Sequence, residues 1–507
     1  MAFLVNIVFI NFWFSNTLFL RAGAAPPPKE VDNAQKTVYN NGKFNAGEHW
    51  AYMKIVIVGD GKVGYTLTKS LSEEGHDLVV IDNNRRILQA SQESLDVAVV
   101  DGNGASVEVQ REAGVGTADL LIAATNGDET NLLCCMVAKK LGCKHTIARV
   151  RNPEYDQQIR FMREELGLSM VINPEKAAAL EIFRLLQFPS FLKRDSFARG
   201  TAELVELKLK EGNPLIGKPL QQFRTVANVN ALVCAVEREG GINIPKGDFT
   251  LLKGDKVTIA ADAADLVRLL KNLKIYAPKA EHVIIVGGSR TATYLARRLT
   301  RSKVRLTIIE QDEKRCMDLS EALPQATVIN GNGTDQKLLL SEGIASTDAV
   351  VSLTGIDEEN LLVSMFANYV GVPKSITKIN RNEYNPIFES MGIDSIVSPK
   401  LLTANEIVRY VRAMEDTTGG SVLTLYKIVE GKAEALEFSV KGEATFLNEP
   451  LYRLRLKKNV LIAAIVRARK VIIPSGADFM QKGDTVIVVT EADRAIRDLK
   501  DIFEGEV

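Results

Sequence analysis

The sequence is poor in the residues on which side-chain catalysis and metal binding depend. It has four histidines and five cysteines among 507 residues, and no C-x-x-C pair occurs. Cys134 and Cys135 are neighbours on an expected helix, so their side chains point to different faces and a shared metal site is not expected. The odd number and scatter of the cysteines fit structural thiols in a reducing compartment.

The chain also carries no net charge at neutral pH. The 63 basic residues balance the 63 acidic ones, so the chain lacks the basic footprint of a nucleic-acid-binding protein. It also contains no Ser-x-x-x-Lys pair and no nucleophile elbow. We therefore expect no nucleic-acid partner, no metal and no catalytic residues.

The first 52 residues do not match the rest of the chain. Residues 3–20 are mostly aromatic and aliphatic, and residues 21–50 are rich in Pro, Asn, Gly and Lys. No Lys or Arg precedes the apolar stretch, although a signal peptide requires a basic region there. The second stretch is typical of disorder. We expect Met53 to be the true start and residues 1–52 to be a disordered leader or a mis-assigned start. A membrane anchor is the alternative.

A glycine motif follows the strand-like run at residues 55–58. This run is apolar and β-branched, which favours a buried parallel strand. The motif reads G-x-G-x-x-G, and the apolar spacing after it predicts a helix. In such a turn Gly59 permits the tight bend, Gly61 lets the backbone approach a phosphate, and Gly64 lets the helix pack on the strand. The helix N-terminus then attracts a pyrophosphate.

An acidic residue stands where a ribose would be recognised. A second apolar run, residues 78–81, ends in Asp82, 23 residues after Gly59. A carboxylate at this place binds ribose hydroxyls and disfavours a 2′-phosphate, which favours NAD or an adenine nucleotide over NADP. The alternative is a βαβ unit whose glycines serve packing only.

Strand-like and helical segments continue to alternate through residue 172. Further strands are expected at 97–100, 120–124, 146–150 and 169–172, and helices at 85–94, 107–113, 132–141 and 154–166. This alternation predicts an α/β fold with a doubly wound, Rossmann-like parallel sheet that is covered on both faces.

The second half of the chain repeats the first. Gly287 lies 228 positions after Gly59 at the end of a matching strand, and Glu310 lies the same distance after Asp82. At an offset of 229, residues 101–104 match 330–333 and residues 128–131 match 357–360. So many coincidences at almost one offset indicate a duplicated domain.

The segments between the two Rossmann-like copies repeat too. Residues 204–209 alternate like an exposed strand, and the turns and strands of 217–260 recur at 448–489. Each Rossmann-like domain is therefore expected to be followed by a small α+β domain. The expected boundaries are 1–52 for the leader, 53–175 and 281–400 for the Rossmann-like domains, and 190–275 and 420–505 for the α+β domains.

The glycine motif is degraded in the second copy. Ser289 replaces the glycine at the place of Gly61, and Ala292 replaces Gly64, which the packing tolerates. The serine brings a side chain toward the phosphate path. Arg290 could offset this by contacting a phosphate, or it is simply solvated. Nucleotide binding by the second copy therefore stays open.

Together these motifs resemble the TrkA family, the regulatory subunits of Trk potassium uptake systems. That family has two tandem RCK (or KTN) units, each an NAD-binding Rossmann domain followed by a TrkA-C domain. The resemblance covers residues 53 to about 500 and leaves the leader without a counterpart. It rests on residues 59–64, Asp82, 125–131, Ile147-Ala148-Arg149, and the Pro-Leu and Lys-Gly-Asp turns of both α+β domains.

The resemblance implies a cytoplasmic, tetrameric gating ring, peripheral on the inner face of the membrane and bound to a potassium-translocating subunit. NAD(H), and ATP or ADP at the same sites, would shift the ring between conformations. Implied contacts in the first copy are Gly59, Asp60, Gly61, Lys62 and Val63 in the loop, Asp82 at the ribose, Thr125 and Asn126 beside the ribose or adenine, and Arg149 at a phosphate or a subunit interface. In the second copy they are Gly287, Gly288, Ser289, Arg290, Thr291 and Glu310.

A dehydrogenase would need an acid or base for hydride transfer in a substrate domain. The small α+β domains lack concentrated titratable groups, so the nucleotide is expected to be a ligand that regulates rather than a redox cofactor. Two alternatives remain open at this stage, namely an NAD-dependent oxidoreductase and the regulatory ring of a different cation transporter.

Overall fold

The computed structural model describes residues 52–381, 387–388, 391–393, 395–415, 422–441, 444–492, 496 and 498–505. The leader predicted at its N-terminus lies outside these residues, apart from Tyr52. Among the described residues, no helix is both long enough and apolar enough to cross a bilayer. The five cysteines are buried and form no disulfides, and burial raises the pKa of Cys134 to about 12.

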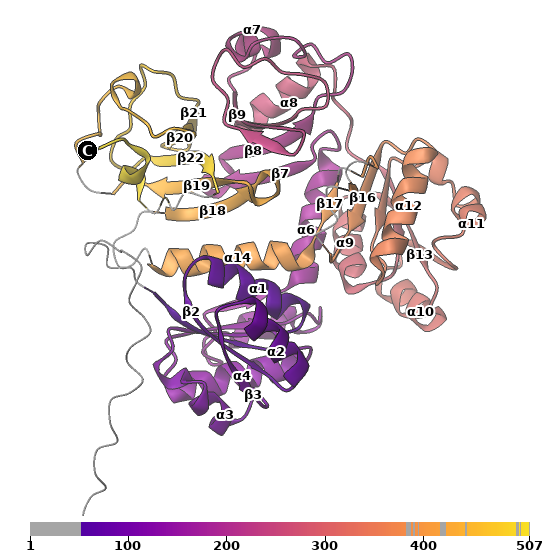
Figure 1. The fold of residues 1–507 in the computed structure, drawn as a ribbon. Coiled ribbons are helices and arrows are strands. Elements are labelled where there is room, and N and C mark those ends of the chain that lie inside the picture. The colour runs from indigo at the N-terminus through magenta and orange to yellow at the C-terminus, as the bar shows by residue number, and fades with distance from the viewer. Residues whose placement is uncertain are drawn as a thin grey trace, which may run out of the picture. The chain divides into compact units, whose positions relative to one another are not determined.

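The first copy is a six-stranded parallel sheet of order β3-β2-β1-β4-β5-β6 (Figure 1). Its strand β1 is buried along four of its five residues, which explains its run of β-branched side chains. The strand order reverses between β1 and β4, where open α/β sheets bind ligands. The elements are β1 (Lys54–Val58), α1 (Lys62–Glu73), β2 (Asp77–Asp82), α2 (Arg85–Ser94), β3 (Ala98–Asp101), α3 (Val107–Glu112), β4 (Leu120–Ala123), α4 (Asp128–Leu141), β5 (His145–Arg149), α5 (Tyr155–Met162) and β6 (Met170–Ile172).

One helix of this copy begins earlier than expected. The sequence predicted a helix over residues 132–141, but α4 begins at Asp128. Asp128 and Glu129 therefore form its first turn, where carboxylates interact favourably with the helix dipole. The repeated motif at 128–131 is thus the start of a helix and not the loop before it.

The second copy has the same order, β14-β13-β12-β15-β16-β17. The predicted fold class, two Rossmann-like parallel sheets each followed by a small α+β domain, is confirmed. The elements of the second copy are β12 (His282–Val286), α9 (Arg290–Arg301), β13 (Arg305–Glu310), α10 (Glu313–Ala322), β14 (Thr327–Asn330), α11 (Gln336–Ser341), β15 (Ala349–Ser352), α12 (Asp357–Tyr369), β16 (Lys374–Lys378) and β17 (Ile396–Val397).

Each small domain is built on a five-stranded antiparallel sheet, of order β10-β9-β11-β8-β7 in the first and β18-β19-β22-β20-β21 in the second. The first contains β7 (Lys193–Phe197), β8 (Ala202–Lys208), α7 (Phe223–Ala227), β9 (Leu232–Arg238), β10 (Gly241–Asn243), β11 (Lys256–Ala261) and α8 (Ala263–Asn272). The second contains β18 (Val422–Ile428), β19 (Ala433–Ser439), β20 (Val460–Arg467), β21 (Lys470–Ile472) and β22 (Thr485–Glu491).

The prediction that residues 204–209 form an exposed strand is wrong. Strand β8 is buried on both faces: Val205 packs in the core of its own domain, and Leu204 packs against the second small domain. Small side chains such as Ala235, Ala435 and Ala463 let the two sheets approach in that shared layer. The alternation therefore reflects two different apolar environments and not one solvated face.

Two helices are exchanged between the Rossmann-like domains. Helix α6 (Pro174–Gln187) follows the first sheet but packs in the core of the second, where Ile182 joins Leu295. Helix α14 (Pro399–Glu415) follows the second sheet but packs on α1, where Ile407 joins Leu67. In Figure 1 α14 (orange) lies beside the indigo helix α1. Each half of the chain thus completes the core of the other.

A charged contact secures one of the exchanged helices. Arg412 of α14 donates two hydrogen bonds of 2.7 Å to the carboxylate of Glu74, which follows α1, and lies 3.9 Å from Glu434 of β19. Burial raises the pKa of Glu434. The guanidinium therefore joins the first Rossmann-like domain, the exchanged helix and the second small domain.

Replacing Arg412 with methionine should lower the free energy of unfolding by about 2 kcal/mol, because Glu74 and the buried Glu434 lose their partner. Urea denaturation followed by circular dichroism measures this loss. The matched control is Arg453→Met, which removes an exposed pair with Glu449 and should cost about 0.5 kcal/mol or less. Equal losses from both variants would show that Arg412 does not secure the exchange.

Candidate functional site

The first glycine of the motif is required by a neighbouring loop. Gly59 has a φ of +90°, and its N–H donates to the carbonyl of Ile81 at 2.8 Å. A Cβ added here would lie 2.7 Å from the backbone nitrogen of Thr125. The end of β1 and the end of β4 therefore meet closely at the point where the strand order reverses.

The other two glycines differ in what requires them. A Cβ on Gly64 would lie 1.8 Å from the carbonyl oxygen of Gly59, so the packing of α1 on β1 requires glycine in this copy, whereas the second copy holds Ala292 there. A Cβ on Gly61 would meet no atom within 4 Å, and the φ of −68° suits any residue. No contact within the described protein explains this glycine, and open space lies in front of it.

The N-terminus of α1 faces this space. Gly61 is its N-cap and provides no side-chain hydrogen bond to the first turn. Lys62 is exposed there, whereas the side chain of Val63 is buried in the core. The first N–H groups of α1 and the Lys62 ammonium together suit an anion such as a pyrophosphate.

The Asp82 carboxylate is held rigidly beside the loop. Its Oδ2 accepts a hydrogen bond of 2.7 Å from the N–H of Asp60, and its Oδ1 accepts one of 2.9 Å from the N–H of Asn84. Two backbone donors therefore fix its orientation and leave further lone pairs for ligand hydroxyls.

Asp60 contributes its backbone to the loop, whereas its side chain turns inward. The carboxylate is 2% exposed and accepts hydrogen bonds from Ser91 and Thr68. Burial raises its pKa; the Ser91 bond opposes this effect, and the Asp82 carboxylate adds to it. The Asp60 side chain thus anchors the loop to α1 and α2 through buried hydrogen bonds.

A buried asparagine ties the ends of β4 and β5 together. Asn131 is fully buried, and its Oδ1 accepts from the N–H of Thr125 at 2.8 Å and from its hydroxyl at 2.6 Å. Its Nδ2 donates to the carbonyls of Thr125 at 3.2 Å and Arg149 at 2.9 Å. Thr125 and Arg149, both predicted site residues, are therefore positioned by Asn131, whose role the sequence analysis missed.

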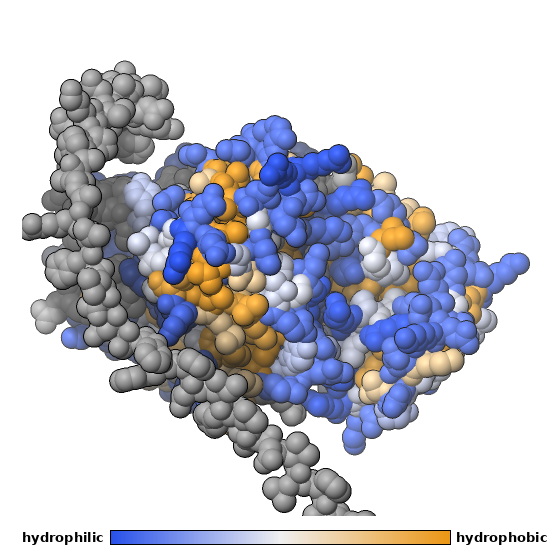
Figure 2. Space-filling view, turned by 90° about the horizontal axis from the view of Figure 1, so that it is seen from below, coloured by the Kyte–Doolittle hydropathy of each residue, from blue (hydrophilic) through white to orange (hydrophobic). Residues whose placement is uncertain are grey.

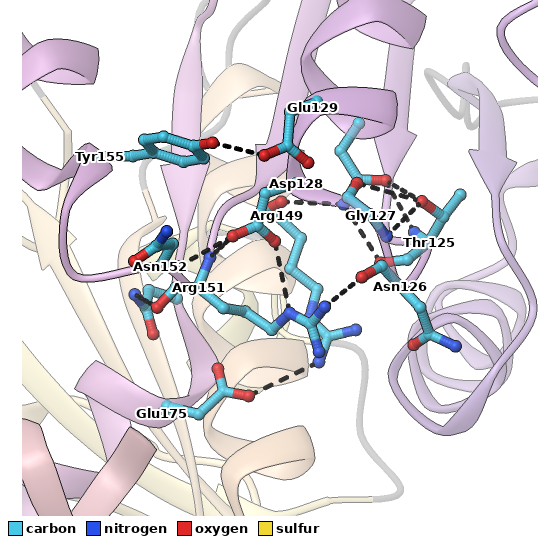
Figure 3. Close-up of polar contacts among 12 residues, drawn as sticks. Thr125, Asn126, Gly127, Asp128, Glu129, Arg149, Arg151, Asn152, Tyr155 and Glu175 are labelled. Atoms are coloured by element: carbon cyan, nitrogen blue, oxygen red, sulfur yellow. Dashed lines mark hydrogen bonds and ion pairs between the residues drawn. The ribbon is translucent and has the colours of Figure 1, made fainter. Parts of the chain in front are cut away.

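Asp128 orients the segment after β5 (Figure 3). Its Oδ2 accepts hydrogen bonds of 2.8 Å from the N–H groups of Arg151 and Asn152, and its Oδ1 lies 3.3 Å from Arg151 Nε. Arg151 also donates to the carbonyl of Asn126. The backbone of Asn126 is thereby held at the edge of the site.

Arg149 is a buried cation with incomplete hydrogen bonding. It is 8% exposed, and its Nε has no partner among the described residues. Its guanidinium lies 3.8 Å from Glu175 of the exchanged helix α6, beyond hydrogen-bond distance. Burial lowers its pKa. An anionic ligand group would relieve this unmet donor, which fits the predicted phosphate role.

In the second copy the same scaffold holds a different loop. Gly287 has a φ of +98°, and Glu310 accepts from the N–H groups of Gly288 at 2.6 Å and Asp312 at 2.9 Å, as Asp82 does in the first copy. Ser289 differs from Gly61, because its hydroxyl accepts from the N–H of Ala292 at 3.4 Å and caps α9. A side chain thus takes the place that an anion could occupy.

The flanking residues of the second loop also differ. Arg290 is exposed, whereas Thr291 is 2% exposed within α9.

Asn360 repeats the contacts of Asn131, accepting from the N–H of Thr354 at 2.8 Å and donating to the carbonyl of Lys378 at 3.0 Å. Lys378 stands where Arg149 stands in the first copy, and burial lowers its pKa. The repeat of Asp and Asn at one offset is a signal that these residues have a role, although it does not indicate which groups they bind.

Comparisons with known proteins agree with this duplication. The TrkA-N domain model matches residues 55–174 and 283–399, and the TrkA-C domain model matches residues 204–274 and 435–504. The chain is 35% identical over 454 residues to Trk system potassium uptake protein TrkA homolog 1 of Methanosarcina mazei, covering 87% of this chain and 98% of that protein. It is 31% identical to TrkA of Haemophilus influenzae, covering 89% and 99%.

Solved structures share the fold. The GsuK RCK domain has a TM-score of 0.57 at 19% identity and covers 88% of this chain and 94% of its own. The GsuK channel bound to NAD has a TM-score of 0.57 at 19% identity, covering 88% and 78%. At this identity the likeness concerns the fold alone.

Proposed function

Because this chain belongs to the TrkA family, we propose that it is a nucleotide-sensing subunit that regulates potassium uptake through a membrane translocation subunit. The observation that carries the proposal is the loop at Gly61, which leaves open space before an uncapped helix N-terminus. Such an arrangement suits a pyrophosphate. A related fold occurs in the GsuK channel bound to NAD.

The first Rossmann-like domain is the principal nucleotide site in this proposal. Backbone N–H groups of the loop and Lys62 would contact phosphates, and Asp82 would bind ribose hydroxyls. Thr125 and Asn126 would border the ribose or adenine, and Arg149 would complete its hydrogen bonding on a phosphate. The ligand is NAD(H), with ADP or ATP as alternative occupants.

The second Rossmann-like domain would bind the same ligands more weakly. Gly287, Gly288 and Glu310 keep the geometry of the first loop, but the Ser289 hydroxyl caps the helix that would face the phosphate. Arg290, exposed beside it, would contribute a charge-assisted contact. Thr291 would take part through its backbone only.

The nucleotide acts as a regulator and not as a redox cofactor. A ligand shifts a conformational equilibrium only by its difference in affinity for the two states. The exchanged helices α6 and α14 would transmit the conformational change between the two halves of the chain, because each belongs to one half and packs in the core of the other. No hydride-transfer acid or base is assigned to either small domain, so the subunit is proposed not to be an enzyme.

Calorimetric titration of the full chain with ADP, ATP, NAD and NADH tests the ligand. We expect a dissociation constant in the micromolar range for at least one of these nucleotides. In a separate experiment, the chain is expected to copurify with a membrane potassium-translocating subunit. Steady oxidation of NADH in the presence of small carbonyl compounds would contradict the regulatory role. Absence of binding by all four nucleotides would contradict the assignment of the site.

The proposed assembly is a tetrameric ring at the cytoplasmic face of the membrane. Apolar side chains stand exposed at matching positions of helices α4 and α12, namely Leu133 and Met136 in the first and Leu362 and Met365 in the second. Figure 2 shows that hydrophobic residues gather into patches on one face of the molecule. Exposed apolar patches of this kind favour subunit contacts.

Replacing both Leu133 and Leu362 with aspartate should therefore break the ring. Light scattering is expected to give the mass of a tetramer for the wild-type chain and a smaller mass for the double variant, because a carboxylate would be buried at each contact. Leu252→Asp, at an exposed leucine of the first small domain, is the control and should leave the tetramer intact. A monomeric wild-type chain at micromolar concentration would contradict the assembly.

A further inference from the structure

A large cavity lies where the two exchanged helices meet the small domains. Its volume is about 1060 Å³, and its walls come mainly from α6, α14, β7 and β18, with the edge strands β6 and β17. This volume is at the upper end of that of sites for small organic ligands. None of the residues proposed for the nucleotide sites lines it, so it is a separate feature of the molecule.

The same four-residue motif lines the cavity from both helices. Residues 181–184 of α6 and residues 406–409 of α14 both read Glu-Ile-x-Arg, and each motif starts seven positions after the proline that opens its helix. Glu181 and Arg184 line the cavity from one helix, and Glu406 and Arg409 line it from the other. The duplication has therefore given one cavity two equivalent charged pairs.

Neither arginine of these pairs is hydrogen-bonded to a carboxylate within the described part of the chain. The Nη1 atom of Arg184 lies 3.8 Å from Glu181 Oε2, which is too long for a hydrogen bond. The guanidinium of Arg409 lies over the ring of Tyr426, 4.5 Å from its centre. Both guanidinium groups therefore keep donors for another partner.

Burial shifts the pKa values of the carboxyl groups beside them upward, toward the neutral form. Burial raises the pKa of Glu181 to about 7, and Asp195 adds to this effect. Burial also raises the pKa of Glu406. Near neutral pH Glu181 therefore offsets the charge of Arg184 only in part. Among the described residues that line the cavity, seven carry cationic side chains and four carry carboxyl groups, so this part of the lining is electropositive.

We propose that this cavity binds a small organic dianion, with one anionic group on Arg184 and the other on Arg409. Arginine guanidinium groups suit carboxylate and phosphate groups through paired hydrogen bonds. Apolar side chains of the same lining, including Leu180, Leu401, Leu402 and Met170, would contact the middle of the ligand. The ligand would bridge the two exchanged helices and so bias their arrangement independently of the nucleotide loop.

The binding should strengthen as the pH falls. Glu181 faces Arg184 on its own helix and Asp195, Lys193 and Arg194 on β7, and Glu406 faces Arg409. Protonation of Glu181 removes a negative charge beside Arg184. A change from pH 8 to pH 6 crosses the pKa of Glu181 and is expected to raise the affinity for a dianion.

Calorimetry of the full chain with saturating ADP, which occupies the nucleotide loop, tests the proposal. The probes are two series of unbranched molecules with four to eight carbons, the α,ω-dicarboxylates and the α,ω-bisphosphonates, with the matching monocarboxylates as controls. We expect one ligand per chain with a dissociation constant below about 1 mM for some length in one series, and the better series identifies the anionic group.

Arg184→Gln and Arg409→Gln should each weaken this binding by about tenfold or more, the loss of one charge-assisted contact. Arg297→Gln, at an exposed arginine of α9, should leave it unchanged, and unfolding curves report whether each variant is folded. Absence of binding by both series would overturn the proposal. Displacement of the probe by ADP, or equal binding by wild type and both folded variants, would overturn it as well.

Discussion

Replacing Gly61 with aspartate is expected to weaken the binding of ADP and NADH at the first loop by at least about a hundredfold, or roughly 3 kcal/mol. The new carboxylate would project into the open space before α1 and would repel a phosphate there. The fold should survive, because an added Cβ meets no atom within 4 Å and the backbone suits any residue. Calorimetry measures the affinity, and thermal unfolding confirms the fold.

The second copy provides the matched control for this change. Gly61→Ser gives the first loop the residue of the second and is expected to weaken binding less than aspartate does, because a hydroxyl caps the helix without adding charge. Ser289→Asp should leave the tight site unchanged. Normal binding of both nucleotides by the Gly61→Asp variant would show that this loop is not the site.

Replacing Asn131 with alanine should cost about 3 kcal/mol of stability, because it leaves buried backbone groups of Thr125 and Arg149 without partners. Binding should also weaken, since both residues belong to the proposed nucleotide site. Urea denaturation measures the first effect, and calorimetry measures the second. A general loss of stability would also weaken binding. The variant therefore needs a control at the equivalent asparagine of the second copy.

Asn360→Ala makes that comparison. Asn360 is fully buried and bonds the backbone of Thr354 and Lys378 as Asn131 bonds its own strands. We expect a similar loss of stability but unchanged affinity at the first loop. If both variants reduced nucleotide affinity equally, positioning by Asn131 would not be specific to the site that it adjoins.

Much of each Rossmann-like sheet could be predicted from the sequence. Buried parallel strands require β-branched apolar runs on both faces, so residues 55–58 and their repeat indicated the fold directly. The constant offset between Gly59 and Gly287 revealed the duplication. These features are local or periodic, and sequence patterns report such features well.

The exchange of α6 and α14 could not be predicted in the same way. Their apolar positions show that each helix has a buried face, but two homologous sheets offer nearly the same partner surface. For the same reason β8 was mistaken for an exposed strand, because a second sheet covers the face that alternation assigned to solvent. In both the helix exchange and the burial of β8, the packing partners lie far apart in the sequence, so the local pattern does not identify them.

The supporting polar groups were also hidden. Asn131 and Asp128 recur in the second copy, yet a repeated polar residue indicates a role without indicating its partners. Their hydrogen bonds run to backbone groups of Thr125, Arg151 and Asn152, which no spacing rule relates to them. Equally, only the structure reveals that Ser289 caps its helix.

The proposal that nucleotide at the first loop regulates potassium uptake is tested most directly by potassium flux. The full chain would be reconstituted in vesicles with a membrane potassium-translocating subunit, and flux measured with ATP, ADP, NADH or no nucleotide. At least one nucleotide should change the flux with the wild-type chain, and none should change it at the same concentration with Gly61→Asp. The proposed function would be contradicted if nucleotide did not change the flux with the wild-type chain. It would also be contradicted if nucleotide changed the flux equally with the Gly61→Asp variant.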